Sequence, residues 1–222
     1  MALINAYNFK LHNNITRYTY DLVGSANGYA TGINRPDVSS NGITFLGGGH
    51  GTIAGDWGRM EFPIETFLHT AEEDFSILIV FNSTKADLQY HSIFHIGDVA
   101  VHSKRINISL NADENENFSI NAFNGVISNN ANLAKYNQVC ITNTTGLCTV
   151  FSNGTKYINT NNAITGVMYD PNSKVTIGGM YKANTNNYAY DYKGSVLSFL
   201  HFNHKLSNAE ISQYNNQLQG II

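Results

Sequence analysis

The sequence carries little charge, little proline and no long apolar run. Of its 222 residues, 13% are charged and 3 are proline, whereas 42% are hydrophobic. Intrinsically disordered chains combine low hydrophobicity with high charge, so this composition is that of a globular protein. The longest uninterrupted apolar segment, residues 77–81, is far shorter than the roughly 20 residues that span a bilayer as a helix. We therefore expect a globular chain without a membrane span.

The charge balance is slightly acidic and offers no basic surface. The net charge is −3 and the isoelectric point is about 6.2. Nucleic-acid binding needs clustered lysine and arginine to neutralise phosphates, so we expect no nucleic-acid partner. Residues 1–8 lack a basic segment followed by an apolar one, so no secretory signal is predicted and synthesis in the cytoplasm is expected. The length favours one domain over residues 1–222, since sandwiches of roughly 200–250 residues fold as one unit.

Asparagine and alternating patterns indicate β structure. The sequence has 31 asparagines against 7 glutamates and 9 lysines, a bias that disfavours helix and favours turns. Apolar and polar side chains alternate strictly in residues 106–110 and 118–122, which predicts a hairpin joined through the acidic turn 111–117. Residues 75–81 and 196–202 are apolar on both faces, as central strands are. Further strands are predicted at residues 138–142, 147–151, 175–179 and 188–192.

One helix is predicted, at the C-terminal end of the chain. Ser207 stands three residues before Glu210, as in a capping box. Leu206 and Ile211 stand where a hydrophobic staple places its pair. The helix should therefore begin at Asn208 and dock one apolar face against a sheet. The residues of that face are Ile211, Tyr214 and Leu218.

Several short motifs follow one another in a distinctive order. The most specific is Leu-Ser-Asn-Ala-Glu-Ile at residues 206–211, because it couples a strand end, a turn and a capped helix. In this order the motifs resemble the laminin G-like branch of the concanavalin A-like jelly rolls. They lie at residues 21–28, 45–47, 75–81, 136–142, 151–154, 177–179, 192–194 and 206–211. The resemblance implies an all-β fold, a two-sheet antiparallel jelly-roll sandwich with a short C-terminal helix, formed as one domain over residues 1–222.

The sequence lacks the catalytic pattern of the related glucanase branch. Those enzymes carry Glu-x-Asp-x-Glu on one strand face, which sets two carboxylates about 5 Å apart. The acidic clusters at residues 72–74 and 113–116 fall in predicted turns instead. No Gly-x-Ser-x-Gly elbow occurs, and the glycine-rich segment 47–52 lacks the lysine of a phosphate loop. We therefore expect no enzymatic activity; a degenerate glycosidase, which needs a carboxylate pair within roughly 5–10 Å, is the third hypothesis.

The sequence has eight histidines, which are common ligands of transition metals, but their spacing argues against such a site. On a strand, His91 and His95 lie about 13 Å apart at a rise of roughly 3.3 Å per residue, and His201 and His204 point to opposite faces. The resemblance implies calcium instead, which laminin G-like domains hold with an aspartate and loop carbonyls at the sandwich rim. Asp98, directly after a predicted strand, is the candidate calcium ligand. Its alternative role is to cap a turn.

Cys140 and Cys148 flank the turn predicted at residues 143–146. A three-residue loop would set the two cysteines directly opposite each other. A four-residue loop would set Cys140 opposite Thr149 and leave no bridge. Because no secretory signal is predicted, we expect two free thiols.

Tyrosine and asparagine gather near the end of the predicted sheet. Tyr188, Tyr190 and Tyr192 alternate, so on one strand they share a face. Exposed rings beside amides suit a sugar, because a ring stacks on pyranose C–H groups and an amide bonds hydroxyls in both directions. The alternative is that Tyr192 packs in the core and brings the others with it. The candidate ligand-binding residues are Tyr181, Asn184, Asn186, Tyr188 and Tyr190.

The leading functional hypothesis is a non-catalytic binding or structural module on the surface of a phage or viral virion. Capsid decoration, a head fibre or tail-associated receptor binding would each fit, with cell-surface or capsular glycans and other virion proteins as partners. This hypothesis rests on analogy of fold. The alternative is a secreted, extracellular carbohydrate-binding module detached from a larger enzyme or adhesin.

Overall fold

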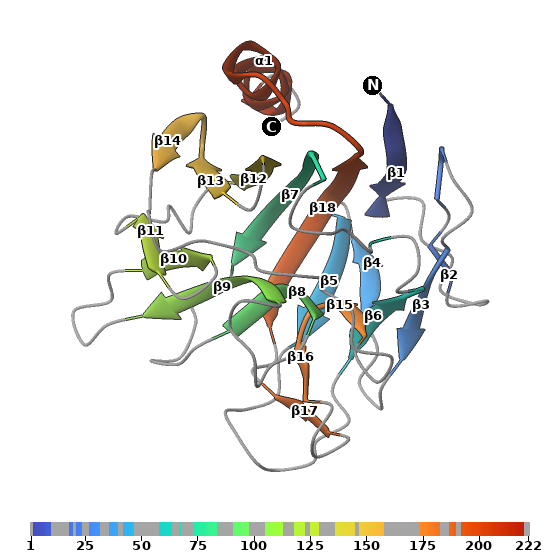
Figure 1. Cartoon of the computed structure of the whole chain (residues 1–222). Helices are drawn as coiled ribbons and strands as arrows, with labels where there is room; N and C mark the ends of the chain where they lie inside the picture. The colour runs from blue at the N-terminus through green and yellow to red at the C-terminus, as the bar shows by residue number, and fades with distance from the viewer. Residues whose placement is uncertain are drawn as a thin grey trace.

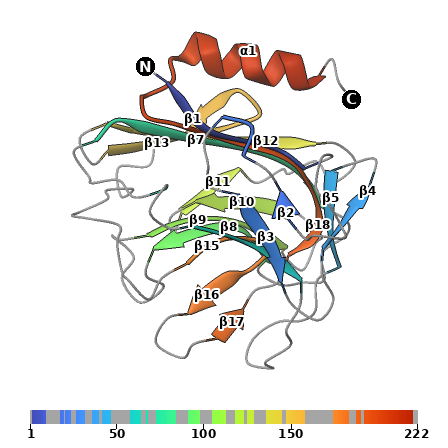
Figure 2. The same ribbon diagram turned by 90° about the vertical axis from the view of Figure 1, so that its right-hand side faces the viewer.

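The computed structural model of the chain shows two antiparallel sheets packed face to face and one helix on the outside (Figures 1 and 2). The structure describes residues 2–9, 18–19, 21–23, 27–31, 36–39, 42–46, 58–63, 67, 73–83, 91–97, 105–112, 118–122, 125–128, 136–144, 147–157, 174–182, 187–189 and 192–219. The predicted all-β jelly-roll sandwich with a C-terminal helix is confirmed. Within those residues no helix is long and apolar enough to cross a membrane.

The first sheet has eight strands, with the two strands that are apolar on both faces at its centre. Its order is β14-β13-β12-β7-β18-β5-β4, and β1 pairs with β18 beside that path. The predictions of central strands at residues 75–81 and 196–202 are therefore confirmed. The strands are β1 (Leu3–Asn8), β4 (Asp37–Ser39), β5 (Gly42–Leu46), β7 (Phe75–Ser83), β12 (Asn137–Thr144), β13 (Leu147–Ser152), β14 (Thr155–Tyr157) and β18 (Lys193–Phe202).

The second sheet also has eight strands, in the order β11-β10-β9-β8-β15-β6-β3-β2. The predicted hairpin is confirmed, since Phe118 of β10 pairs with Ala112 of β9. Its connection is shorter than predicted, because β9 runs on to Ala112. The strands are β2 (Tyr18–Thr19), β3 (Gly28–Thr31), β6 (Arg59–Phe62), β8 (His91–Gly97), β9 (Arg105–Ala112), β10 (Phe118–Ala122), β11 (Gly125–Ser128) and β15 (Val175–Ile177).

Aromatic side chains fill the space between the sheets. Tyr7 of β1 meets Phe62 of β6 edge to face at 4.9 Å between ring centroids. Phe94 of β8 stacks on Phe199 of β18 at 5.1 Å. Each pair joins one sheet to the other, and all four side chains are buried. Burial of such large apolar rings is a main source of the sandwich's stability.

The helix α1 (Asn208–Gln219) begins at the predicted residue and covers the outer face of the first sheet (Figure 2). Ile211 is buried there with Leu78, Val80 and Cys140. Tyr214 packs against the same cluster, as predicted, while the side chain of Leu218 lies outside the described residues. The first sheet can therefore be apolar on both faces, since the helix covers its outer face.

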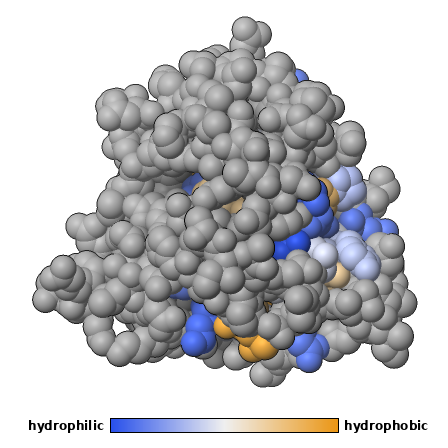
Figure 3. Space-filling view, turned by 90° about the horizontal axis from the view of Figure 1, so that it is seen from below, coloured by the Kyte–Doolittle hydropathy of each residue, from blue (hydrophilic) through white to orange (hydrophobic). Residues whose placement is uncertain are grey.

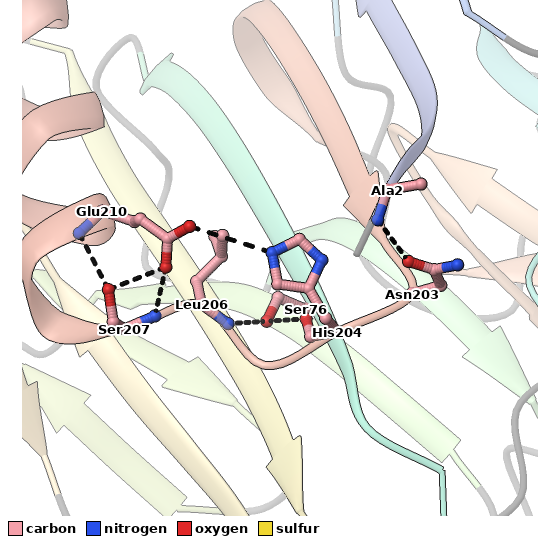
Figure 4. A network of polar contacts seen from close by, with 7 residues as sticks. All are labelled: Ala2, Ser76, Asn203, His204, Leu206, Ser207 and Glu210. Carbon is pink, nitrogen blue, oxygen red and sulfur yellow. Dashed lines mark hydrogen bonds and ion pairs between the residues drawn. The ribbon is translucent and has the colours of Figure 1, made fainter.

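The predicted capping box is confirmed at the start of α1 (Figure 4). The Glu210 backbone amide donates to Ser207 Oγ at 3.3 Å, and the Ser207 amide donates to Glu210 Oε2 at 2.7 Å. The Ser207 hydroxyl and amide bonds hold the pKa of the Glu210 carboxyl below its usual value. Ser76 of β7 ties this turn to the sheet, because its hydroxyl donates to the His204 carbonyl and accepts from the Leu206 amide.

The turn between β12 and β13 is tighter than either predicted loop. Thr144 pairs with Leu147, so two residues make the connection. This register sets Cys140 opposite Phe151 and Cys148 opposite Asn143, and both predicted registers are wrong. Cys140 lies under the helix and Cys148 lies between the sheets. The two thiols therefore lie on opposite faces of the sheet, and both are free.

A bend at Gly178 and Gly179 turns the chain out of the second sheet into a separate two-stranded ribbon. The ribbon consists of β16 (Met180–Lys182) and β17 (Asn187–Ala189), and it stands on the outer side of the second sheet (Figures 1 and 2). The Gly178 amide donates to the Ile93 carbonyl at 3.0 Å, and the Tyr192 amide donates to the Gly178 carbonyl at 2.9 Å. Thr176 Oγ1 donates to the Gly179 carbonyl at 2.6 Å. These three bonds fix the base of the ribbon.

We predict that neither thiol reacts in the folded protein. Burial raises the pKa of Cys148 to about 12 and that of Cys140 also well above its usual value. Because the thiolate is the reactive form, iodoacetamide at mildly alkaline pH should leave the native protein unmodified and alkylate two cysteines in guanidinium chloride, as read by intact mass. Rapid alkylation of the native protein would contradict the burial of these residues.

Gly178→Ala should destabilise the protein more than Gly154→Ala does. Both glycines have positive φ, 96° and 79°, so each alanine meets a backbone penalty of roughly 1–2 kcal/mol. At Gly178 the added Cβ would also lie 2.4 Å from the Phe45 ring, an overlap of the kind that costs about 1–3 kcal/mol. At Gly154 the nearest atom is 3.4 Å away, on the side chain of Asn215. Urea unfolding measures both variants, and equal losses would refute the steric argument.

Candidate functional site

The outer face of the second sheet carries a continuous row of polar and aromatic residues. In β6, Met60 and Phe62 are part of the core, so Glu61 between them points outward. Residues paired with Glu61 from strand to strand form a row that crosses six strands. The members of the row, one from each strand, are Asn107, His95, Thr176, Glu61, Tyr29 and Tyr18.

Exposure increases along this row. Asn107, His95 and Thr176 are buried, and each makes a hydrogen bond with a group nearby. Ser92 Oγ donates to Asn107 Oδ1 at 2.9 Å. His95 Nε2 lies 3.1 Å from the Gly97 carbonyl, which can only accept, so Nε2 carries the hydrogen. The row becomes accessible at β6 and β3.

Glu61 lies at this accessible end between two cations. Its Oε1 is 3.2 Å from Arg59 Nε and its Oε2 is 2.9 Å from Lys174 Nζ. The Arg59 side chain is only 5% exposed, that of Glu61 is 24% exposed, and that of Lys174 is 40% exposed. Tyr29, the register partner of Glu61 on β3, is 37% exposed. The arrangement fixes a carboxylate beside a solvent-facing ring.

The ribbon brings two of the predicted ligand-binding residues together. Tyr181 of β16 is the register partner of Tyr188 of β17, so the two lie directly opposite each other on one face of the ribbon. Because β16 follows the short strand β15 and contacts β8, the ribbon stands next to the polar row. The predicted residues Asn184, Asn186 and Tyr190 lie outside the described residues.

The prediction of one strand over residues 188–192 is wrong. The strand β17 spans Asn187–Ala189, and Tyr192 directly precedes β18 in the first sheet. Tyr192 is buried against Phe45 and Phe81, and its hydroxyl donates to the Asn82 carbonyl at 2.9 Å. Tyr192 therefore belongs to the core, as the alternative interpretation had it, and Tyr188 belongs to the ribbon.

The described histidines have structural partners. His201 is buried between the sheets, where it stacks on Phe67 at 5.0 Å and contacts Asn5 Oδ1 through Nδ1 at 2.9 Å. Asn5 Nδ2 in turn donates to Asp21 Oδ2 at 2.5 Å. No group of three or more His, Cys, Asp or Glu stands ready to hold a metal ion in the described ranges. Asp98 lies outside those ranges, so the calcium site stays a prediction.

A serine, a histidine and a glutamate meet at the start of α1, yet their bonds are not those of a catalytic triad (Figure 4). A triad needs the serine hydroxyl bonded to the imidazole. Here the Ser76 hydroxyl donates to the backbone carbonyl of His204 instead. The His204 imidazole faces Glu210, with 3.9 Å between Nε2 and Oε1. These contacts fasten the helix, and the nearby bond from the Ala2 amide to Asn203 Oδ1 joins the start of β1 to the end of β18.

Comparison with known proteins identifies similar folds. No family model matches the sequence, and no curated protein matches it. A Trypanosoma rangeli sialidase solved with sialic acid has a TM-score of 0.67 at 15% identity, over 99% of this chain and 33% of that chain. The binding domain of botulinum neurotoxin serotype D/C has a TM-score of 0.62 at 15% identity, over 98% of this chain and 52% of that chain.

A further structure of the toxin binding domain was solved in complex with SialylT, and its TM-score to this chain is 0.60 at 15% identity. The chain thus spans about a third of the sialidase and about half of the toxin binding domain. At these identities the likeness concerns the fold. The chain shares their antiparallel β-sandwich fold, which agrees with the jelly-roll sandwich that the sequence motifs predicted.

Proposed function

We propose that this protein is a glycan-binding module whose ligand lies against the β16–β17 ribbon on the outer side of the second sheet. The observation that carries the proposal is the register of the ribbon, which sets Tyr181 opposite Tyr188. Paired tyrosines offer aromatic faces for pyranose C–H groups and hydroxyls for sugar oxygens. Three hydrogen bonds fix the base of the ribbon, so its backbone position does not depend on a ligand.

The similar folds support the glycan as the ligand class. One neighbour is a sialidase solved with sialic acid, and another is a toxin binding domain solved with SialylT. Sialylated glycans are therefore the first ligands to test on this protein, and neutral oligosaccharides should be tested in parallel.

The polar row offers a ligand a carboxylate that is held in place. The two oxygens of Glu61 lie 3.2 Å from Arg59 Nε and 2.9 Å from Lys174 Nζ. A carboxylate held in this way is suited to accept hydrogen bonds from the hydroxyls of a sugar.

A glycan array with ribbon variants tests the proposal. Tyr188→Ala and Tyr181→Ala should each weaken binding roughly tenfold, because the loss of one stacked ring costs about 1.4 kcal/mol. Tyr188→Phe keeps the ring and should bind nearly as the wild type does. Gln217→Ala, on the exposed part of α1 at the far end of the molecule, is the control (Figure 2). An array that stays blank for the wild type, or alanine variants that bind normally, would refute the proposal.

For the setting, we propose display on the surface of a phage or viral particle, where other virion proteins would hold the module. Mass spectrometry of purified particles should then detect this chain in a fixed ratio to the major capsid protein. Particles that lack the chain, with the chain present in the medium, would overturn the virion setting in favour of a secreted module detached from a larger enzyme or adhesin.

A further inference from the structure

We infer that the accessible end of the polar row, at Tyr29 and Glu61, is a second sugar subsite that takes a neutral, hydroxyl-bearing pyranose of the same glycan. The inference rests on the proposed function, since it extends the ligand from the ribbon onto the sheet. It concerns residues that the sequence motifs did not single out.

The register sets the ring and the carboxylate side by side. Tyr29 and Glu61 are direct partners in the β3–β6 ladder, and such partners have Cβ atoms about 4.5–5.5 Å apart. Tyr18 of β2 follows as the next member of the row. Among the described residues, four large hydrophobic side chains are exposed, and Tyr29 is the aromatic one. A ring next to a carboxylate provides a stacking face and a hydrogen-bond acceptor within the width of one pyranose.

The two cations hold Glu61 in place for a ligand. Arg59 approaches one carboxylate oxygen and Lys174 the other, and the arginine side chain is almost fully buried. The Glu61 side chain is 24% exposed, so a hydroxyl of a ligand can reach its carboxylate. Because the side chain is already ordered, binding would not cost the rotamer entropy of a mobile glutamate. Hydroxyl donors of a sugar fit this acceptor.

Charge decides between a sugar hydroxyl and a sugar carboxylate at this position. An acidic group that reached Lys174 would lie within a few ångströms of the Glu61 carboxylate, since Nζ and Oε2 are 2.9 Å apart. Like charges at that distance repel each other, and the second cation, Arg59, is only 5% exposed, so it offers an acidic group no contact of its own. The subsite therefore selects hydroxyls, and an acidic sugar residue of the same glycan would have to bind elsewhere.

The position of this subsite suits a ligand that also reaches the ribbon. Strand β15 pairs with β6 on one side and β8 on the other, and the ribbon continues from β15. In the view from the ribbon side, described hydrophilic residues gather on the flank where β3 and β6 lie in Figure 1 (Figure 3). An oligosaccharide that lies across β15 and β6 would contact both places.

Titration of purified variants with the best array glycan, by calorimetry, tests the subsite. Glu61→Gln should bind at least tenfold more weakly, because the amide offers one acceptor oxygen in place of two. Tyr29→Ala should also lose about tenfold, whereas Tyr29→Phe should stay within about twofold of the wild type. Thermal melting of each variant checks the fold, and the Tyr29 pair decides the matter if Glu61→Gln proves unstable.

Three outcomes would overturn the inference, and they separate it from the proposed function. In the first, Tyr29→Ala and a folded Glu61→Gln bind normally while Tyr188→Ala loses binding. This result would refute the second subsite and would leave the proposed site on the ribbon intact. In the second, Glu61→Gln binds sialylated glycans more tightly and Lys174→Ala binds them more weakly. This result would show that the position binds a sugar carboxylate instead of hydroxyls. A wild type that binds no glycan on the array refutes the proposed function and this subsite together.

Discussion

Alternation of side chains along the strands is the constraint on which both faces of the sandwich depend. In β7, Ile77 and Ile79 point into the core while Leu78 and Val80 point outward, where α1 covers them. In β6 the same alternation sends Glu61 outward. The first sheet therefore needs a helix on its outer face, whereas the second sheet presents polar groups and the ribbon. This difference between two sheets of the same size is the reason the proposed binding site is placed on the second sheet.

The ribbon depends on a local break in that alternation. Residues 175–179 were predicted as one strand, but the chain leaves the sheet at Gly178, whose φ is 96° and whose missing Cβ makes room for Phe45. The bend therefore ends β15 after three residues and starts β16 in a new direction. A residue with a side chain at this position would have a strained backbone and would overlap Phe45, so the bend requires glycine.

Local signals in the sequence predicted the elements well, because their causes lie within a few residues. The capping box at Ser207, for example, specifies its own backbone, and it forms. The resemblance to the jelly rolls rested on such signals in order. The predicted register of the Cys140–Cys148 hairpin was wrong because it depends on the exact length of the turn. A change of one residue in the turn shifts every cross-strand pair, and the sequence of the strands does not indicate that length.

The accessible site could not be predicted because it is made of partners far apart in the chain. Tyr29 meets Glu61, and Lys174 meets the same carboxylate, through the order of strands in the second sheet. The alternation Arg59-Met60-Glu61-Phe62 shows that the two charged residues share a face, but it does not show what lies beside them. Only the pairing of β6 with β3 and β15 supplies that information.

Charge is scarce in this protein, so its concentration at one place requires a reason. Three of its 29 charged side chains, from 13 basic and 16 acidic residues, meet at Glu61. Burial of Arg59 has a desolvation cost that its pairing with Glu61 offsets only in part, and an apolar pair of similar size would be expected to stabilise the sheet equally well or better. Stability alone therefore does not explain the cluster. The proposed subsite would explain it, because a fixed acceptor next to an exposed ring gives a ligand a specific polar contact.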